Sequence, residues 1–488
     1  MPARPNIVFI TTDQHRGDCL GCAGHPVLET PYLDQMAAGG IRFTAAYTSV
    51  PSCTPARAAM LTGMDQWHHG RLTMRGQDAL EFPATLPGEL AQAGYHTQGV
   101  GKMHHHPQRR LYGFHHMVLD ESGRRIGNFV SDYHRWFAEH KQGPYGYRDH
   151  SIDWNSWMAR PSHLPEHLHP TYWTAGEGVK FIENRDPTKP FFLWLSFARP
   201  HSPYDPPQTY YDMYINNPDI PMPPIGDWTA PFDQRNDDVN APFTHRSDAE
   251  VRRARAAYYG SITFIDHQIG RFLHEFALAD NAAFQNTLFI FTSDHGDMMG
   301  DHYHWRKTYG YEGSAHVPFI IRFPKWMNMP QGQLREQPIE MRDIMPTILD
   351  AAGVAIPDSV DGDSLLPLCK DALAPWREFV QGEHTFSYGM EWGNQWVTDG
   401  KEKYIWFHHT GRELFFDLRQ DPQECRDLAK DPAAEPRLAV WRRRLAEINE
   451  RRGDPRGQDL KLVPQPNGAI SLSPYYEKWK ERAAETLS

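Results

Sequence analysis

This chain of 488 residues lacks several features that define common classes of protein. It has only 5 cysteines, an odd and sparse count that argues against a disulfide framework and fits a reducing compartment. It has no run of 18 apolar residues, so we expect no membrane span and no membrane partner. The net charge of -11 argues against a nucleic-acid partner, because phosphate-binding surfaces rely on clustered Lys and Arg. A small anionic substrate remains compatible, since a local pocket can be basic on an acidic protein.

The N-terminus also lacks the pattern of a secretory signal, because residues 1–12 have no basic segment followed by a long apolar run. We therefore expect a cytoplasmic protein. If the chain is a mature form, a periplasmic or secreted location is the alternative. Cys19 and Cys22 form a CxxC, but no second CxxC accompanies it, and a metal or redox role is not favoured.

The composition supports a large core, with 40% hydrophobic residues, 15 Trp and 21 Tyr. Short apolar runs predict buried parallel strands that alternate with helical segments, which is typical of an α/β protein. The predicted strands are 6–12, 96–100, 191–197, 288–292 and 317–321. From about residue 386 the sequence pattern changes, and it predicts short strands separated by turns, followed by a helix near 435–451. We expect a catalytic domain over residues 1–385 and a smaller C-terminal subdomain over 386–488.

One stretch, Pro51 to Gly63, combines a cysteine with a helix start. Thr54 is predicted to cap the helix and Pro55 to occupy its first position, which places Cys53 just before the N-terminus. Free N–H groups and the helix dipole favour an anion there. Arg57 lies about one turn further on and is expected to point back at the same place. The stretch therefore predicts a nucleophile beside a site for an oxyanion.

Acidic residues follow two of the predicted strands directly. Asp13 and Gln14 come after the first strand, and Asp294 and His295 come after the strand at 288–292. Sites in α/β sheets form beyond the carboxyl ends of the strands, and oxygen ligands suit a hard cation. A lone Asp in such a position more often caps a turn, and we expect that simpler role for Asp297.

Taken together, these motifs resemble those of the type I sulfatases of the alkaline phosphatase superfamily. The resemblance rests on Cys53-x-Pro55-x-Arg57 with Leu61-Thr62-Gly63, on Lys102-x-His104, on Arg199-Pro200-His201-x-Pro203, on Lys307 ahead of Tyr311-Glu312, and on the acidic pairs. It runs from Asn6 to about Leu428. It implies a large, mixed, mostly parallel central sheet flanked by helices, with a small C-terminal antiparallel sheet and helix.

The resemblance also implies two cofactors. Cys53 would be oxidised to formylglycine by a formylglycine-generating or maturase enzyme. One divalent metal, Ca²⁺ in preference to Mg²⁺ or Mn²⁺, would be held by Asp13, Gln14, Asp294 and His295. Gln14 departs from the acid pair with which the family site commonly opens, and this removes one negative charge from the metal shell.

The implied mechanism is nucleophilic catalysis on a sulfate monoester of a sugar, an aryl or a small alkyl alcohol. A hydroxyl of the hydrated formylglycine attacks sulfur, while Lys102, Lys307 and Arg57 neutralise the sulfate oxygens. His201 gives a proton to the leaving alcohol. His104 then takes a proton from the second hydroxyl, which expels sulfate and restores the aldehyde.

Two other functions remain open. A phosphonate monoester or phosphodiester hydrolase on the same scaffold is compatible with the Asp-Gln and Asp-His pairs, although Lys102-x-His104 argues against it. A non-catalytic, metal-dependent binder of sulfated glycans is the alternative of another class.

Two segments with little periodicity are expected to be irregular. We expect long loops within residues 105–170 to wall the pocket, and an irregular connection over residues 202–248. The C-terminal tail, with Tyr475, Tyr476 and Trp479, is a candidate contact in a homo-oligomer, and a plain surface helix is the alternative.

Overall fold

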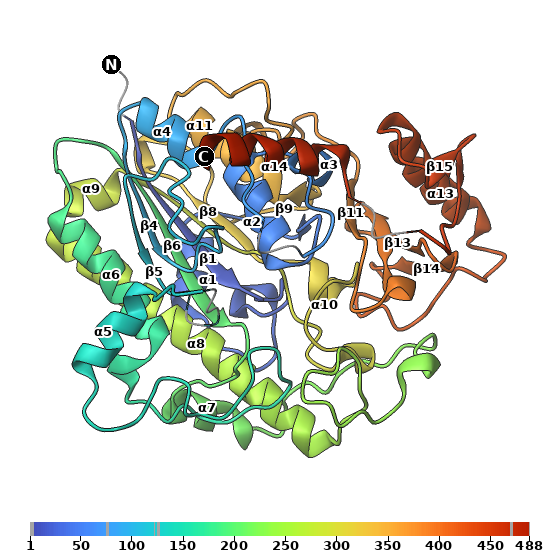
Figure 1. The fold of residues 1–488 in the computed structure, drawn as a ribbon, viewed down its shortest axis with the longest axis horizontal. Coiled ribbons are helices and arrows are strands. Elements are labelled where there is room, and N and C mark those ends of the chain that lie inside the picture. Colours follow the sequence, from blue (N-terminus) through green and yellow to red (C-terminus); the bar gives the residue numbers. More distant parts are fainter. Residues whose placement is uncertain (1–3, 75–77, 122, 124–126, 469–471, 488) are drawn as a thin grey trace.

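An eight-stranded sheet forms the centre of the molecule (Figure 1). The computed structural model describes residues 4–74, 78–121, 123, 127–468 and 472–487. The strands, in spatial order, are β5 (His116–Leu119), β4 (His96–Gly101), β6 (Phe191–Pro200), β1 (Asn6–Asp13), β7 (Thr287–Ser293), β8 (Phe319–Arg322), β2 (Ile41–Phe43) and β9 (Gln333–Arg335). The first five are mutually parallel, and β8 is antiparallel to both β7 and β2. The predicted mixed, mostly parallel sheet is confirmed.

Helices cover both faces of this sheet, which explains why its central strands are almost continuously apolar. One face packs on α1 (Pro31–Ala38), α6 (Pro170–Asn184) and α8 (Asp248–Ala279). The other face packs on α2 (Cys53–Thr62), α4 (Leu86–Gln92), α11 (Ile344–Ala351) and α14 (Pro474–Leu487). Figure 1 shows these two layers on either side of the strands. Every residue of β1 is buried as a result.

The stretches for which the sequence predicts loops contain, among their described residues, one strand and two α-helices. They are β5, α5 (Asp132–His140) and α7 (Gln208–Ile215). β5 is short and its first residue, His116, is exposed, so it shows little apolar signal. α5 has only two buried residues, Tyr133 and Phe137, and most of its other residues are polar.

A second, antiparallel sheet lies beside the first (Figure 1). It consists of β11 (Val380–His384), β12 (Asn394–Thr398), β13 (Glu402–Phe407) and β14 (Arg412–Asp417), and α13 (Glu435–Arg451) packs on it. The predicted small sheet and helix are thus present. β11 begins before residue 386, and the division into domains 1–385 and 386–488 stays a prediction.

The C-terminal helix α14 packs on α3 (Gln66–His69) of the same chain. Tyr476 is fully buried, and Trp479 donates from Nε1 to the carbonyl of His68 at 2.7 Å. These two aromatic side chains therefore pack within their own chain. An oligomer contact through the tail stays a prediction. Of the helices that the structure describes, none is sufficiently long and apolar to span a membrane.

Among the described residues, the remaining strands and α-helices are short. They are β3 (Ala46–Tyr47) paired with β10 (Ile339–Glu340), β15 (Gly457–Gln458) paired with β16 (Lys461–Leu462), α9 (Asn281–Gln285), α10 (Glu312–Ala315) and α12 (Leu366–Lys370). Single turns of 3-10 helix lie at η1 (Gly21–Ala23), η2 (Glu166–Leu168), η3 (Ala230–Phe232), η4 (Asp301–Tyr303), η5 (Lys325–Met327), η6 (Met341–Asp343) and η7 (Met390–Trp392).

Candidate active site

Four neighbouring parallel strands end at one edge of the central sheet, and a predicted site residue stands at each end. Asp13 is the last residue of β1, and Lys102, His201 and Asp294 follow β4, β6 and β7. β1 pairs with β6 and β7, and β4 pairs with β6. Residues far apart in the sequence therefore meet at the same edge, as the rule for parallel sheets predicts.

Cys53 is the first residue of α2, and Ser52 precedes it as the N-cap. The prediction that Thr54 caps this helix is wrong, because the carbonyl of Ser52 already accepts the first helical hydrogen bond, from Ala56 at 3.1 Å. The Cys53 side chain is buried at the positive end of the helix dipole. The helix therefore favours a negatively charged group at this position.

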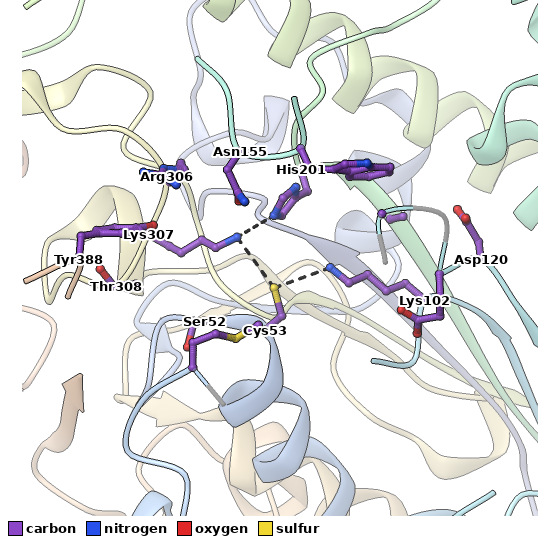
Figure 2. A pocket seen from close by; sticks show the side chains of 15 residues that line it. Ser52, Cys53, Lys102, Asp120, Asn155, His201, Arg306, Lys307, Thr308 and Tyr388 are labelled. Carbon is purple, nitrogen blue, oxygen red and sulfur yellow. Dashed lines mark hydrogen bonds between the residues drawn. The ribbon is translucent and has the colours of Figure 1, made fainter. Parts of the chain in front are cut away.

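The Cys53 thiol faces an imidazole and two ammonium groups, and Figure 2 shows its contacts with the two ammonium groups, those of Lys102 and Lys307. Its Sγ lies 3.3 Å from His295 Nε2, 3.7 Å from Lys102 Nζ and 3.9 Å from Lys307 Nζ. Asp13 Oδ1 lies 3.6 Å away on the same side as His295. Four of the predicted residues thus converge on position 53.

Arg57 binds neighbouring protein groups. Its Nε donates to Asp294 Oδ2 at 2.9 Å, and its Nη1 donates to the carbonyl of Lys102 at 2.6 Å and to Ser196 Oγ at 3.0 Å. The guanidinium therefore ties α2 to the segments that end β4 and β7. A contact between Arg57 and a bound oxyanion stays a prediction.

Two carboxylates and an imidazole converge beside the thiol. Ligand atoms of Asp13, Cys53, Asp294 and His295 all lie within 4.8 Å of one another. His295 Nδ1 is 2.9 Å from the carbonyl of Gly296, so a proton on Nδ1 leaves the lone pair of Nε2 facing Asp13 and Asp294 at 3.4 and 3.6 Å. Burial lowers the pKa of His295 to about 3, so the imidazole is neutral at pH 7. This set of electron-pair donors fits a divalent cation.

Gln14, the fourth predicted ligand, lies beside this cluster. Its side-chain oxygen accepts a hydrogen bond from Lys307 Nζ at 2.8 Å, and its amide donates to Asp297. Asp297 does more than the turn or cap role that we expected. One carboxylate oxygen accepts from the backbone N–H of Met299, as in a turn, but the other is buried against Gln14 and Tyr204. Asp297 therefore also holds the Gln14 side chain.

Two lysines approach the thiol from opposite sides, and a histidine stands between (Figure 2). Lys307 Nζ is 2.7 Å from His201 Nε2, while His201 Nδ1 is 2.8 Å from the carbonyl of Ser202. Lys102 contacts the carboxylate of Asp13. Burial, Lys307 and Lys102 together hold the pKa of His201 well below its usual value. The imidazole is therefore neutral and accepts a hydrogen bond from Lys307.

His104 is a predicted catalytic residue whose ring forms no hydrogen bond with the Cys53 thiol. Its backbone is left-handed, with φ of 60°, and its N–H donates to Glu121, as does that of Met103 at 3.0 Å. The ring is buried, and neither ring nitrogen has a hydrogen-bond partner among the residues that the structure describes. His104 is not one of the described residues that line the cavity at Cys53. Its catalytic role stays a prediction.

A cavity of about 380 Å³ opens beside Cys53, and Lys102, His201 and Lys307 line it. Several polar or aromatic residues on its wall carry no motif in the sequence, among them Asp120, Glu121, Trp154, Asn155, Arg306 and Tyr388. Asp120 and Glu121 directly follow β5, so they carried the same signal as Asp13, an acid at a strand end. The first four of these residues lie within 105–170, the stretch that we expected to wall the pocket.

Comparison with known proteins gives consistent matches. A family model described as "Sulfatase" matches residues 5–354, and one described as "N-sulphoglucosamine sulphohydrolase, C-terminal" matches residues 300–451. An arylsulfatase of Clostridium perfringens (strain 13 / Type A) is 44% identical over 463 residues, which cover 92% of this chain and 95% of the relative.

One further relative and one solved structure are also similar to this chain. The multifunctional alkaline phosphatase superfamily protein PehA of Trinickia caryophylli is 30% identical over 491 residues, covering 88% of this chain and 92% of that protein. Among solved structures, the phosphonate monoester hydrolase of Agrobacterium radiobacter superposes with a TM-score of 0.76 at 24% identity, covering 92% of this chain and 96% of that chain.

Proposed function

Because this chain belongs to the sulfatase family and is a sulfuric ester hydrolase, we propose that it cleaves a sulfate monoester with a formylglycine made from Cys53 and one divalent cation. The substrate would be a sugar, aryl or small alkyl sulfate. The observation that carries the proposal is the position of Cys53. It begins α2, and its Sγ lies 3.7 and 3.9 Å from the ammonium groups of Lys102 and Lys307. A nucleophile at this position is surrounded by groups that stabilise negative charge.

The two cofactors would supply a hydrated aldehyde as the nucleophile and a Lewis acid for the sulfate oxygens. Asp13, Asp294 and His295 would hold the cation, with Gln14 as a further ligand. Ca²⁺ fits a set dominated by oxygen, and Mg²⁺ or Mn²⁺ are the alternatives. A formylglycine-generating or maturase enzyme would modify Cys53.

The cationic side chains would act on the oxygens of the transferring group. Lys102 and Lys307 flank position 53 from opposite sides and would neutralise charge as the S–O bond breaks. Arg57 keeps Asp294 ionised. Although burial opposes it, His295 and Arg57 lower the pKa of Asp294 to about 2. A charged, correctly oriented carboxylate is what a cation ligand requires.

His201 would protonate the leaving alcohol. Its Nε2 faces Lys307 inside the cavity, and its Nδ1 is held by the carbonyl of Ser202. The imidazole is neutral in the free protein, and the negative charge of a bound sulfate ester would raise its pKa and favour a proton on Nε2. His104 is assigned the second proton transfer on the Lys102-x-His104 motif alone.

A phosphonate monoester or phosphodiester hydrolase is the second candidate. It is supported by the Asp13-Gln14 and Asp294-His295 pairs and by the similarity to PehA. The Lys102-x-His104 motif argues against it.

The ratio of the rates on a sulfate ester and on a matched phosphonate ester separates the two functions. The test compares kcat/KM for 4-nitrophenyl sulfate and for a 4-nitrophenyl phosphonate monoester, with protein whose Cys53 is fully converted as judged by mass. We expect the sulfate to be preferred by more than about tenfold, and Cys53→Ala to abolish both activities. A reversed preference would establish the second candidate instead.

A further inference from the structure

Arg306 is a buried cation on the cavity wall, next to Lys307 (Figure 2). It is only 7% exposed. Within the described ranges of the chain, its guanidinium forms no ion pair with an Asp or Glu, and its Nε has no hydrogen-bond partner. The residues outside those ranges include no Asp or Glu. The charge of Arg306 is therefore not neutralised by a side-chain carboxylate.

This is unusual for a buried charge, because an unpaired ion away from water is strongly unfavourable. Elsewhere in the described chain, Arg199 lies 2.8 Å from Asp205, and Arg255 pairs with Asp301. The buried Arg335 has no ion pair with a described residue either, but it donates to three backbone carbonyls. Arg306 instead has one hydrogen bond from Nη2 to a carbonyl and a contact with the Tyr388 ring, whose centroid is 4.4 Å from its Cζ. These contacts replace part of the lost hydration but leave the positive charge uncompensated.

The backbone around this side chain is also strained. Arg306, Thr308 and Tyr388 have φ values of 67°, 88° and 59°, in the left-handed region that non-glycine residues rarely adopt. The Arg306 N–H is held by Asp297 Oδ1 at 2.9 Å, which fixes this conformation. Strain of this kind persists where the surroundings impose it, and it is common at binding sites. Here it places consecutive cations, at 306 and 307, on the wall of one cavity.

We propose that Arg306 binds a second anionic group of the substrate, a carboxylate or a further sulfate. The proposal rests on the function proposed above, because it assumes that the sulfate ester lies between Lys102 and Lys307. A guanidinium suits this role, since its parallel N–H donors match two oxygens of such a group. Asp120 lies on the cavity wall near Lys102, opposite Arg306 (Figure 2). The carboxylate adds negative charge on that side of the cavity, so an anionic group of the substrate is more favourable beside Arg306.

Matched aryl sulfates test this binding. The substrates are 3- and 4-carboxyphenyl sulfate and the corresponding carboxamides, which have the same shape without the charge. We expect the wild-type protein, with Cys53 converted, to prefer at least one carboxylate. Arg306→Gln should lower kcat/KM for that carboxylate about tenfold to a hundredfold more than for its carboxamide, mainly through KM. Arg306→Lys, which keeps the charge, should retain part of the preference.

Arg322→Gln is the matched control. Arg322 also stacks on aromatic rings, with its Cζ 5.3 Å from the Phe284 centroid, but it lies on β8 and does not line the cavity. This variant should leave the carboxylate-to-carboxamide ratio unchanged. Melting temperatures establish whether each variant is folded. If Arg306→Gln is not folded, Arg306→Lys replaces it, and a carboxylate-to-carboxamide ratio below that of the wild-type protein supports the proposal.

Two results would overturn the proposal: no preference of the wild-type protein for either carboxylate, or an equal loss on both members of a pair in Arg306→Gln. If the wild-type protein cleaves none of the four sulfates but cleaves a phosphonate monoester, the ester chemistry proposed above is wrong, and the role of Arg306 falls with it.

Discussion

At the scale of single residues, the two histidines at strand ends owe their properties to their neighbours. Burial lowers the pKa of His295 to about 3, and burial with two nearby lysines holds that of His201 well below its usual value. Both rings are therefore neutral and present Nε2 as an electron-pair donor. His295 presents it to carboxylates, where a cation fits, and His201 presents it to an ammonium group. The same side chain thus suits metal binding in one place and proton transfer in the other.

His201→Ala is expected to affect substrates according to their leaving group. An alkyl or sugar alkoxide needs protonation as it departs, whereas nitrophenolate needs little. The loss in kcat should reach about 10²–10⁴-fold on an alkyl or sugar sulfate and stay below about tenfold on 4-nitrophenyl sulfate. Steady-state kinetics on one preparation measure both. His245→Ala, at an exposed histidine, is the control. Equal losses on the two substrates would exclude His201 as the acid.

Cys53 should be modified in active protein. Conversion of the thiol to an aldehyde lowers the mass of the tryptic peptide by about 18 Da. The converted fraction should scale with the specific activity across preparations that differ in maturase co-expression. Peptide mass spectrometry with activity assays measures both quantities. Full activity in a preparation that contains only unmodified Cys53 would contradict the mechanism.

Asp294→Asn should remove the divalent cation with little change in shape. The amide cannot carry the negative charge that the cation and Arg57 both face. We expect metal content, measured by elemental analysis after dialysis, to fall from about one per chain to a trace, together with activity. Asp237→Asn, at an exposed position, should bind metal normally. A full complement of metal in Asp294→Asn would show that the ligand assignment is wrong.

Which site residues can be predicted from sequence depends on whether a local pattern marks them. Asp13 and Asp294 directly follow recognisable apolar runs, so their place at the sheet edge could be inferred. Glu121 has the same relation to β5, but that strand is too short and too exposed at its start to be recognised. Arg306 and Tyr388 lie in irregular segments, and only the folded chain brings them together.

At the scale of elements, the end of β5 supports the loop that follows β4. The N–H groups of Met103 and His104 both donate to Glu121, while the carbonyl of Lys102 accepts from Arg57 and its N–H donates to Ser196. His104 has a left-handed backbone, so the loop depends on these contacts. Lys102 is thereby aimed at Cys53 from a short loop that has no regular structure of its own.

Glu121→Ala should therefore lower kcat/KM more than Glu121→Gln does, because the amide oxygen can still accept both N–H groups. A loss of about tenfold or more is expected for Ala, corresponding to two broken hydrogen bonds to a buried group. The control is Glu139→Gln, at an exposed position near the end of α5, which should leave kcat/KM unchanged. Equal losses in the two Glu121 variants would argue against support of the loop through hydrogen bonds.

The same Glu121→Gln variant should also change how stability responds to pH. Burial raises the pKa of Glu121 from 4.5 to about 7, so the folded state holds this proton more tightly than the unfolded state. The unfolding free energy should therefore fall as pH rises from about 4.5 to about 7, by up to about 1.4 kcal/mol per unit from this group. Denaturant unfolding at several pH values, with Glu121→Gln as the reference, measures the contribution. An identical slope in both proteins would contradict it.

At the scale of the whole molecule, the C-terminal third packs against the edge of the central sheet where the candidate site residues lie. His384, at the end of β11, lies with its Nε2 3.1 Å from Ser52 Oγ, and Asn394 donates to the carbonyl of Thr308 at 3.1 Å. Tyr388 lines the cavity itself. The small sheet is thus part of the site. None of this could be predicted from the sequence, because contacts between segments hundreds of residues apart leave no local periodicity.

Lys403 connects the small sheet to the segment that carries Lys307. It is fully buried on β13, with Nζ 2.5 Å from Glu312 Oε1 and 3.1 Å from Glu424 Oε1. Glu312 begins α10, shortly after Lys307. Although burial opposes it, Lys403 lowers the pKa of Glu312 well below its usual range. Removal of the cation would leave the buried carboxylate of Glu424 beside that of Glu312, which is half-buried and also lies 3.1 Å from His316.

Lys403→Met is therefore expected to lower the unfolding free energy by about 3–5 kcal/mol and to reduce activity through a displaced Lys307. Denaturant unfolding and kcat/KM for 4-nitrophenyl sulfate measure the two effects. Lys401→Met, at an exposed position on the adjoining turn, should stay within about 0.5 kcal/mol of the wild type. Adding Glu312→Gln and Glu424→Gln to Lys403→Met should recover part of the stability, because the unpaired charges are then gone. If the triple variant is less stable than Lys403→Met alone, unpaired carboxylate charge is not the reason that this position needs a lysine.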